Sequence, residues 1–369
     1  MALNSAAPAT KLTIRGVRTR AVNVPMTFVL GTSAGAIRTA PLLLIDLETE
    51  EGVTGRAYVF GIYPGGPRVI GAVIEDAVAM IKGQPLAPAD LAKHLLRRFL
   101  LIGVTGVVRM ALSAIDSAMW DALAVAAGKP LATLLGGSPK PIPAYNSNGL
   151  GLMGPEKTAD EALKLLESDL KAVKLRLGYA TLEEDVAVAR AVRRALPSAV
   201  TLMTDYNQAL DTPEAIRRGR ALEDEGIYWI EEPIRHDDYA GNAAITEALK
   251  VHVQIGENFN GPQAMAQAIA AKACDLVMPD LARIGGVSGW MQAAGLAAAH
   301  DIPMSSHLFP EVSAHLMAVT PTAHWLEYMD WASAVLEEPA VLRDGCLIVS
   351  DKPGSGLAWD EKAVAKYAA

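Results

Sequence analysis

Residues 227–232 read Ile227-Tyr228-Trp229-Ile230-Glu231-Glu232, a short apolar run that ends in two carboxylates. Its length and its apolar, aromatic content are those of a buried strand. A similar run, Val200–Asp205, precedes it, and another, Val251–Glu257, follows it. Each run ends in an acidic side chain, and an amphipathic helical pattern separates each run from the next. The arrangement is typical of successive βα units in a parallel sheet.

The same pattern extends outward in both directions over residues 139–340. The short runs are Ile142–Tyr145, Ala172–Leu177, Val200–Asp205, Ile227–Glu232, Val251–Glu257, Asp275–Asp280, Ile302–His307 and Trp325–Tyr328. Eight strands with helices between them is the count of a TIM barrel. We therefore predict an α/β fold with a TIM-type (β/α) barrel as the catalytic domain.

The first 138 residues follow a different pattern. Strand-like runs at Leu12–Val17, Ala40–Leu47 and Val53–Val59 precede helical periodicity, which is clearest over Val107–Ala127. This order predicts an N-terminal α+β domain over residues 1–138. The polar, glycine-containing stretch Thr27–Thr39 is long for a simple connection and predicts a functional loop.

The closing segment, residues 341–369, falls outside the barrel count. It contains a strand-like run, Cys346–Val349. We expect this segment to pack back toward the N-terminal domain.

Composition excludes several classes of protein. The 369 residues carry a net charge of −8 and no run of basic side chains, which disfavours nucleic-acid and anionic-membrane partners. No window approaches the roughly 18 apolar residues of a membrane span. Residues Met1–Lys11 lack the pattern of a signal peptide, so we expect a cytoplasmic protein. Cys274 and Cys346 form no motif and are expected to be free.

Polar side chains end five successive predicted strands, about 23 to 27 residues apart: Asp205, Glu231, Glu257, Asp280 and His307. In a TIM barrel such residues meet at the C-terminal mouth, where active sites lie. The first three carboxylates would repel one another unless a hard cation lay between them, and oxygen-only ligation suits Mg²⁺. Any one of them alone is as readily a helix N-cap, but the shared period favours a metal site.

Asp280 and His307 end neighbouring strands. The carboxylate can accept a hydrogen bond from one imidazole nitrogen and leave the other facing a substrate, which suits a general base. A histidine that caps the next helix is the alternative.

Lys174 and Arg176 are one residue apart on the second predicted strand, so both point into the barrel. A bound substrate carboxylate is a reason for buried cations there. Glu327, on the last strand, faces the same pocket. It is either a protonated acid that donates a hydrogen bond to a developing enolate oxygen or the partner of Lys174 in a salt bridge.

The chain resembles the mandelate racemase group of the enolase superfamily, that is, the mandelate racemase / muconate lactonizing enzyme family, over nearly its whole length. The segments that carry the resemblance are Arg18-Thr19-Arg20, Ala21-Val22-Asn23-Val24-Pro25, Asp205-Tyr206-Asn207-Gln208, Trp229-Ile230-Glu231-Glu232-Pro233, Ser305-Ser306-His307-Leu308-Phe309 and Thr320-Pro321-Thr322-Ala323-His324-Trp325-Leu326-Glu327.

The resemblance implies an enolase-type modified barrel under an N-terminal capping domain, and a homo-oligomer. It implies that Mg²⁺ is held by Asp205, Glu231 and Glu257, and that Mg²⁺ and Lys174 together bind the substrate carboxylate. It further implies that Glu327 is the electrophilic acid, that His307, oriented by Asp280, is the base for one enantiomer, and that Asn207 and Ser147 contact the substrate.

Arg176 departs from the family pattern. Mandelate racemase has a Lys-x-Lys motif whose second lysine is the base for the opposite enantiomer, and arginine stands at that position here. To act as a base near neutral pH a lysine must lose about 3 units from its reference pKa, whereas an arginine must lose about 5.5 to 7. The substitution favours one-base chemistry, in which Arg176 stabilises charge or binds substrate.

The predicted pocket lining is apolar. The long N-terminal segment supplies Ala34 and Ile37, and Leu308 follows the proposed base, as do further apolar residues: Phe28, Val29, Leu30, Ile62 and Met329. Such side chains suit an aryl or alkyl substituent rather than a sugar acid. Arg38 is the exception, and we expect it to lie in solvent rather than bind a second anionic group.

The sequence predicts Mg²⁺-dependent removal of the proton alpha to the carboxylate of a small 2-hydroxycarboxylate through a metal-stabilised enediolate, in a mandelate racemase-like racemase or epimerase. A one-base acid-sugar dehydratase is the first alternative. A metal-dependent carboxylate-binding protein without turnover is the second, and a structural barrel without a site would make the spacing of the strand ends a coincidence.

Overall fold

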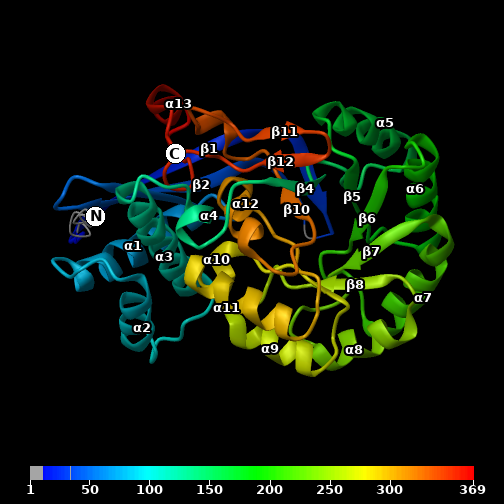
Figure 1. Cartoon of the computed structure of the whole chain (residues 1–369). Coiled ribbons are helices and arrows are strands. Elements are labelled where there is room, and N and C mark those ends of the chain that lie inside the picture. The colour runs from blue at the N-terminus through cyan, green and yellow to red at the C-terminus, as the bar shows by residue number, and fades with distance from the viewer. Residues whose placement is uncertain (1–10, 34) are drawn as a thin grey trace, which may run out of the picture.

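A computed structural model describes residues 11–33 and 35–369. Two parts of the chain lie side by side: a sheet with helices at one side and a barrel at the other (Figure 1). This is the enolase-type architecture expected from the sequence, an N-terminal capping domain joined to a modified TIM barrel. The N-terminal residues 1–10, on which the signal-peptide expectation rests, and Ala34 lie outside the described residues.

The capping domain begins with an antiparallel sheet. Strands β1 (Ile14–Thr32), β2 (Gly35–Thr49) and β3 (Thr54–Phe60) lie in the order β1-β2-β3. The helices that follow are α1 (Gly66–Ile81), α2 (Pro88–Arg98), α3 (Gly106–Ala126) and α4 (Leu131–Leu134). The apolar residues of β2 and of α3 are buried against each other and form the core of this domain.

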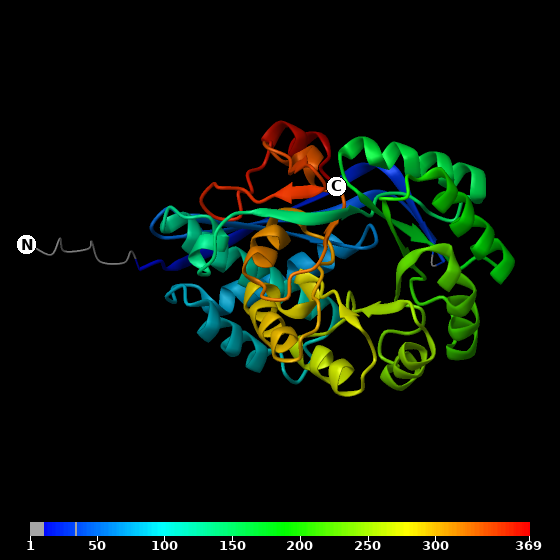
Figure 2. The same cartoon turned by 45° about the vertical axis from the view of Figure 1, so that its right-hand side comes forward.

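The predicted loop over Thr27–Thr39 is wrong. β1 and β2 continue beyond the sheet as a two-stranded ribbon, in which Leu30 pairs with Ile37 and Thr32 pairs with Gly35, after an irregularity that begins at Pro25. Glycine and polar residues are tolerated because the end of the ribbon is largely exposed. We call residues 26–33 and 35–39 the capping hairpin, and it reaches the mouth of the barrel (Figure 2).

The barrel is a parallel ring with one irregular position. Its strands are β4 (Pro141–Asn146), β5 (Ala172–Arg176), β6 (Thr201–Asp205), β7 (Ile227–Glu231), β8 (His252–Ile255), β9 (Leu276–Val277) and β10 (Leu326–Tyr328). β4 to β9 pair in sequence order, and β10 pairs with β4.

The predicted strand Ile302–His307 is not a continuous strand. Only isolated bridges are present, Val277 to Met304, Met304 to Ala323 and Asp280 to His307, and these close the ring between β9 and β10. Proline lacks a backbone N–H to donate, and both segments contain one, Pro279 and Pro303. The irregularity lies directly beside the predicted base.

Helices cover the outside of the barrel. They are α5 (Pro155–Leu165), α6 (Leu182–Ala195), α7 (Thr212–Leu222), α8 (Tyr239–Ala248), α9 (Pro262–Ala270), α10 (Leu281–Ile284), α11 (Gly286–Ala299) and α12 (Pro310–Val319), with short 3-10 turns η1 (Leu166–Ser168), η2 (Glu223–Glu225) and η3 (Ser333–Val335). In α6, a capping box of Thr181 and Glu184 satisfies the first backbone donors. Val188 and Val192, four residues apart, are buried in the same cluster as the strand residue Val173.

The C-terminal segment returns to both parts of the molecule. β11 (Val341–Arg343) and β12 (Cys346–Ile348) form a hairpin, and β12 pairs antiparallel with β4, where the sequence predicted a strand. Beyond it, α13 (Glu361–Lys366) lies near the N-terminal sheet: the indole of Trp359 donates to Asp46 at 2.8 Å, and the Asn23 amide donates to the Tyr367 carbonyl at 2.8 Å.

The predicted domain boundaries at residues 138 and 340 fall between elements, and the division into domains stays a prediction. No helix of the described part of the chain is long and apolar enough to cross a membrane.

Candidate active site

A cavity of about 150 Å³ lies at the C-terminal mouth of the barrel, under the capping hairpin. This volume is below the roughly 300–1,000 Å³ of pockets for drug-sized ligands, so the site suits a small molecule. One wall is charged and comes from the barrel strands. The other wall is apolar and consists of Leu30, Ile37, Phe60, Ile62, Leu308, Met329 and Trp331.

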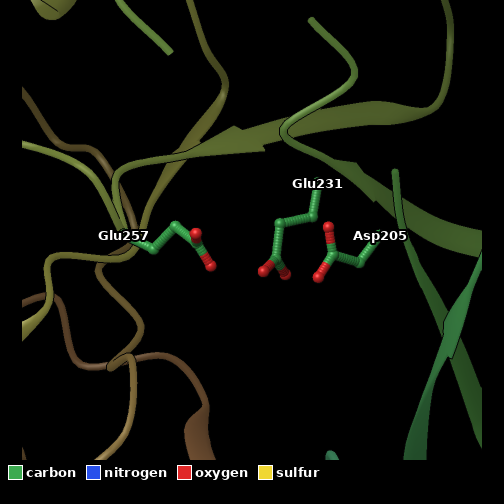
Figure 3. A group of neighbouring side chains, drawn as sticks. All are labelled: Asp205, Glu231 and Glu257. Carbon is green, nitrogen blue, oxygen red and sulfur yellow. The ribbon is translucent and has the colours of Figure 1, made fainter. Parts of the chain in front are cut away.

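Asp205, Glu231 and Glu257 lie together at this mouth. Each offers an oxygen, and these three oxygens are within 4.8 Å of one another. The carboxylates of Asp205 and Glu231 lie at the ends of adjacent strands, and that of Glu257 approaches from the loop after β8 (Figure 3). Glu257 is two residues beyond the end of β8 rather than on it. The predicted cluster is therefore present, with one member on a loop.

The raised pKa values of two of these carboxyl groups indicate that the neighbouring cations do not fully offset the negative charge of the cluster. Burial raises the pKa of Glu231 to about 8, although Lys174 acts in the opposite direction. Burial also raises the pKa of Asp205, and the nearby charge of Glu257 adds to that effect. A hard cation would offset this crowding, and three carboxylate oxygens are the donor set that Mg²⁺ prefers. The residues present fit the metal that the sequence predicted.

Lys174 is buried beside the cluster. Its ammonium lies 2.6 Å from a Glu231 oxygen, 2.8 Å from a Glu327 oxygen and 3.6 Å from an Asp205 oxygen. Burial alone would lower the pKa of Lys174, but these three carboxylates outweigh it and raise the pKa. Lys174 is thus a fixed positive charge at the floor of the cavity.

His307 and Asp280 form the predicted pair. The Nδ1 atom of His307 lies 2.6 Å from the Asp280 carboxylate, and its Nε2 atom lies 3.1 Å from a Glu257 oxygen. Burial opposes the charged imidazole, but the charges of Glu257 and Glu327 and the Asp280 hydrogen bond outweigh it and raise the pKa of His307 well above its usual value. Asp280 also caps α10 by accepting from the Ala282 amide, so the orienting carboxylate is itself held in place.

Glu327 takes the second of its two predicted forms. One oxygen pairs with Lys174, and the other accepts a 2.9 Å hydrogen bond from the Leu308 amide. Burial would raise the pKa of Glu327, but Lys174 and His307 outweigh burial and lower the pKa to about 2. The carboxylate is therefore ionised in this arrangement, not a protonated acid.

Arg176 points into the barrel, as predicted, and lines the cavity. Its donors are used by the loop after β4: Nη1 donates to the Ser147 carbonyl at 2.6 Å and to the Gly149 carbonyl at 2.9 Å, and Nη2 donates to the Ser147 hydroxyl at 2.9 Å. Ser147 is fully buried behind this contact and is not among the cavity-lining residues. The predicted contact between Ser147 and the substrate stays a prediction.

Most of the other predicted substrate-binding residues line the cavity. Asn207, Ile37 and Leu308 line the cavity, and the Asn207 amide also donates to Asp205 at 2.9 Å. Ala34 lies outside the described residues. Arg38 is exposed, as the sequence analysis expected.

Sequence reasoning missed several cavity residues. Arg283 lines the cavity and donates to the Glu257 carbonyl at 2.8 Å. It follows Asp280 by three residues, so its position after a barrel strand was an available signal. Phe60 and Trp331 lie in ring contact at 4.3 Å, but they come from β3 and from the chain after β10. No sequence spacing brings these two together.

Two family models match the chain. Residues 14–136 match the model described as "Mandelate racemase / muconate lactonizing enzyme, N-terminal domain", and residues 157–363 match the model described as "Enolase C-terminal domain-like". A curated relative, L-talarate/galactarate dehydratase of Salmonella typhimurium, is 33% identical over 326 residues, which are 87% of this chain and 81% of the relative.

Two solved structures are similar over nearly the whole chain. An enolase from alpha proteobacterium bal199 with bound magnesium is 48% identical, with a TM-score of 0.95 and coverage of 97% of this chain and 100% of that one. An enolase from Bradyrhizobium complexed with magnesium and mandelic acid is 43% identical, with a TM-score of 0.93 and coverage of 98% and 99%. Both domain models and these neighbours agree with the predicted family. The chain belongs to the mandelate racemase / muconate lactonizing enzyme family of the enolase superfamily.

Proposed function

We propose that this protein abstracts the proton alpha to the carboxylate of a small 2-hydroxycarboxylate, with His307 as its single base and Mg²⁺ as its cofactor. The observation that carries the proposal is the position of the His307–Asp280 pair, which is buried at the same cavity as the three-carboxylate cluster. A base beside a cation site is the arrangement that deprotonation next to a carboxylate requires, because the carbanion needs a nearby positive charge.

Asp205, Glu231 and Glu257 would hold the metal, which, when bound, would offset the negative charge that builds as the α-proton leaves. Lys174 adds a fixed positive charge on the carboxylate side. Asp280 accepts the Nδ1 proton and so leaves Nε2 of His307 as the atom that takes the substrate proton. We propose that Nε2 loses its own proton when a bound metal offsets the Glu257 charge that here raises the pKa of His307. We propose that Glu327 becomes the acid only after its surroundings change on binding, because here Lys174 keeps it ionised.

The apolar wall supports an aryl or alkyl substituent on the substrate. Seven of its residues present carbon surface to the cavity, and a sugar acid would leave its hydroxyl groups without partners against them. The Bradyrhizobium neighbour, 43% identical, was crystallised with mandelic acid. A mandelate-like 2-hydroxycarboxylate is therefore our first proposal for the substrate class, and racemisation or epimerisation would be its net reaction only if a second proton donor acts from the Arg176 side.

Dehydration is the second candidate, and the contacts of Arg176 favour it. Racemisation needs a proton donor on the face opposite His307, and the guanidinium on that side donates instead to backbone carbonyls. In a one-base dehydration His307 takes the α-proton and returns it to the departing β-hydroxyl group, so that the C–O bond breaks and an enol and water form. Curated relatives of this chain include acid-sugar dehydratases.

Proton NMR in D₂O with Mg²⁺ tests both candidates. The protein is incubated with each enantiomer of mandelate and, separately, with a panel of sugar acids. Exchange and inversion from both mandelate enantiomers would establish racemisation and remove the one-base proposal, whereas loss of water from a sugar acid would establish dehydration. Exchange of the α-proton of one enantiomer alone supports the single base. Binding of mandelate without exchange of either enantiomer would reduce the protein to a carboxylate binder and overturn the proposal.

A further inference from the structure

Arg176 is a buried cation whose partners are neutral. Its side chain is 3% exposed, and within the described part of the chain no carboxylate lies within ion-pair distance of it. Three hydrogen bonds instead join its guanidinium to the Ser147 carbonyl, the Gly149 carbonyl and the Ser147 hydroxyl. A buried charge is costly unless its donors are satisfied. Both terminal nitrogens are satisfied by that loop, whereas Nε has no partner among the described residues, so the contacts indicate that the side chain fixes the loop.

The loop in question, residues 147–154, connects β4 to α5, and we call it the β4–α5 loop. Its conformation is held at two further points. The Arg176 amide donates to the Leu150 carbonyl at 3.0 Å, and the Leu150 amide donates to the Glu161 carboxylate at 2.6 Å. Leu150 has a positive φ, a conformation that a residue other than glycine keeps only where surrounding contacts hold it. Arg176 supplies the contacts from the barrel side.

The capping hairpin rests on this loop. Gly31 of the hairpin lies against Gly151 so closely that a Cβ on Gly151 would come within 2.7 Å of the Gly31 backbone nitrogen and oxygen. Phe28 of the hairpin packs into the barrel cluster that contains Leu150. A Cβ on Gly149 would lie 3.1 Å from that of Phe28. The capping hairpin and the β4–α5 loop are therefore in direct backbone contact, with no room for a side chain on Gly151.

The hairpin in turn forms part of the cavity wall. Leu30, Thr32 and Ile37 line the cavity, and Gly31 is the chain neighbour of the first two. A shift of the hairpin away from Gly151 would carry these three side chains with it. The contact between Gly31 and Gly151 thus sets where the apolar wall stands relative to the charged wall.

We propose that Arg176 is a positioning residue that holds the β4–α5 loop as the platform on which the capping hairpin rests. The planar guanidinium reaches two carbonyls and a hydroxyl at once with donors on two different nitrogens. A lysine carries its donors on one nitrogen and cannot span the same set. The inference rests on the proposed function only in taking the cavity as the substrate site, since the contacts themselves are independent of any reaction.

Amide hydrogen exchange measured by mass spectrometry on the full-length protein with Mg²⁺ tests the proposal. Three variants are compared with wild type: Arg176→Lys, Gly151→Ala and Gly31→Ala. The last is a matched control, because a Cβ on Gly31 meets the Gly151–Leu152 backbone only at an ordinary 3.5 Å. Peptides from α6 report whether the barrel itself stays folded.

In Arg176→Lys we expect exchange to accelerate by roughly tenfold or more in both the β4–α5 loop and the capping hairpin, because local opening sets the exchange rate. Gly151→Ala should accelerate the hairpin alone, and Gly31→Ala should match wild type. Acceleration of the loop but not the hairpin in Arg176→Lys would overturn the proposal, as would unchanged exchange in both. Should Arg176→Lys fail to fold, equal behaviour of the two glycine variants would overturn it.

A kinetic readout separates this proposal from that of the single base. With a turned-over substrate, Gly151→Ala should raise KM by roughly tenfold while kcat changes less than threefold, because the wall is displaced but His307 is not. A fall in kcat with unchanged KM would contradict the positioning role. If wild type turns over no 2-hydroxycarboxylate, the proposed function fails, but the exchange experiment still decides the role of Arg176.

Discussion

The two sides of the cavity mouth carry basic side chains in very different circumstances. On one side His307 has the Asp280 carboxylate at Nδ1, and its Nε2 lies 3.1 Å from Glu257 of the three-carboxylate cluster. On the other, Arg176 has its guanidinium nitrogens on the carbonyls and the hydroxyl of a loop. We propose that the first exchanges a proton and that the second holds structure. A site with one base and a site with two bases thus differ in the hydrogen-bond partners of the second basic side chain, and not in whether such a side chain is present.

Removal of Mg²⁺ should have the largest effect, because the metal would stabilise the carbanion whichever side of the cavity exchanges the proton. With the metal chelated, the three carboxylates repel one another and the cation between them, which would stabilise the carbanion most strongly, is lost, although Lys174, Arg176 and Arg283 still line the cavity. We expect α-proton exchange to fall below detection and to return when Mg²⁺ is restored. Exchange that survives chelation by EDTA, with metal content verified, would show that the cluster serves another purpose.

His307→Asn should disable one side alone. Asparagine keeps the hydrogen-bonding shape but cannot accept the α-proton, so exchange should fall by roughly 10²- to 10⁴-fold. His94→Asn, on the exposed face of α2, is the matched control and should leave the exchange rate unchanged. Equal rates in the two variants would remove His307 as the base.

Glu327→Gln should lower the exchange rate by roughly 10²- to 10³-fold if Glu327 becomes the acid that stabilises the developing oxyanion. Glutamine retains an acceptor for the Leu308 amide, so the loop after His307 keeps that contact. The measurement is the NMR exchange rate at saturating substrate. A rate within a factor of three of wild type would assign Glu327 only to the salt bridge with Lys174.

Mg²⁺ affinity should depend on pH, since the metal must bind ionised carboxylates. The pKa of Glu231 is raised to about 8 in the metal-free protein, mainly by burial. Below that pH a proton must leave as the metal enters, so the dissociation constant should rise by up to about tenfold per pH unit from pH 8 downward. Calorimetric titrations in buffers of different ionisation enthalpy measure the released proton. Absence of proton release at pH 6.5 would contradict the raised pKa.

Arg176→Lys should have the smallest effect on proton transfer itself. If the arginine only positions the loop, kcat for the enantiomer that His307 deprotonates should change by less than about tenfold, and the preferred enantiomer should stay the same. New inversion of mandelate in this variant would instead show that the pKa of the side chain was the only barrier to a second base.

Much of the fold and the three-carboxylate cluster could be predicted because barrel strands end at one mouth, so that residues regularly spaced along the chain lie close together in space. Asp205, Glu231, Asp280 and His307 all follow from that rule. The rule fails where tertiary contacts decide the position: Phe60 reaches the cavity from β3, and the capping hairpin folds as a ribbon although its composition is that of a loop. Arg176 shows a further limit, since spacing predicts the direction of a side chain but not which acceptors will use its donors.

Exchange of the α-proton in D₂O, followed separately for each enantiomer of a 2-hydroxycarboxylate, tests the central claim most directly. A single base at His307 predicts deuterium incorporation into one enantiomer without inversion, and negligible incorporation into the other over the same period. Incorporation into both enantiomers at comparable rates, with inversion, would show that a second base works from the Arg176 side and would contradict the account.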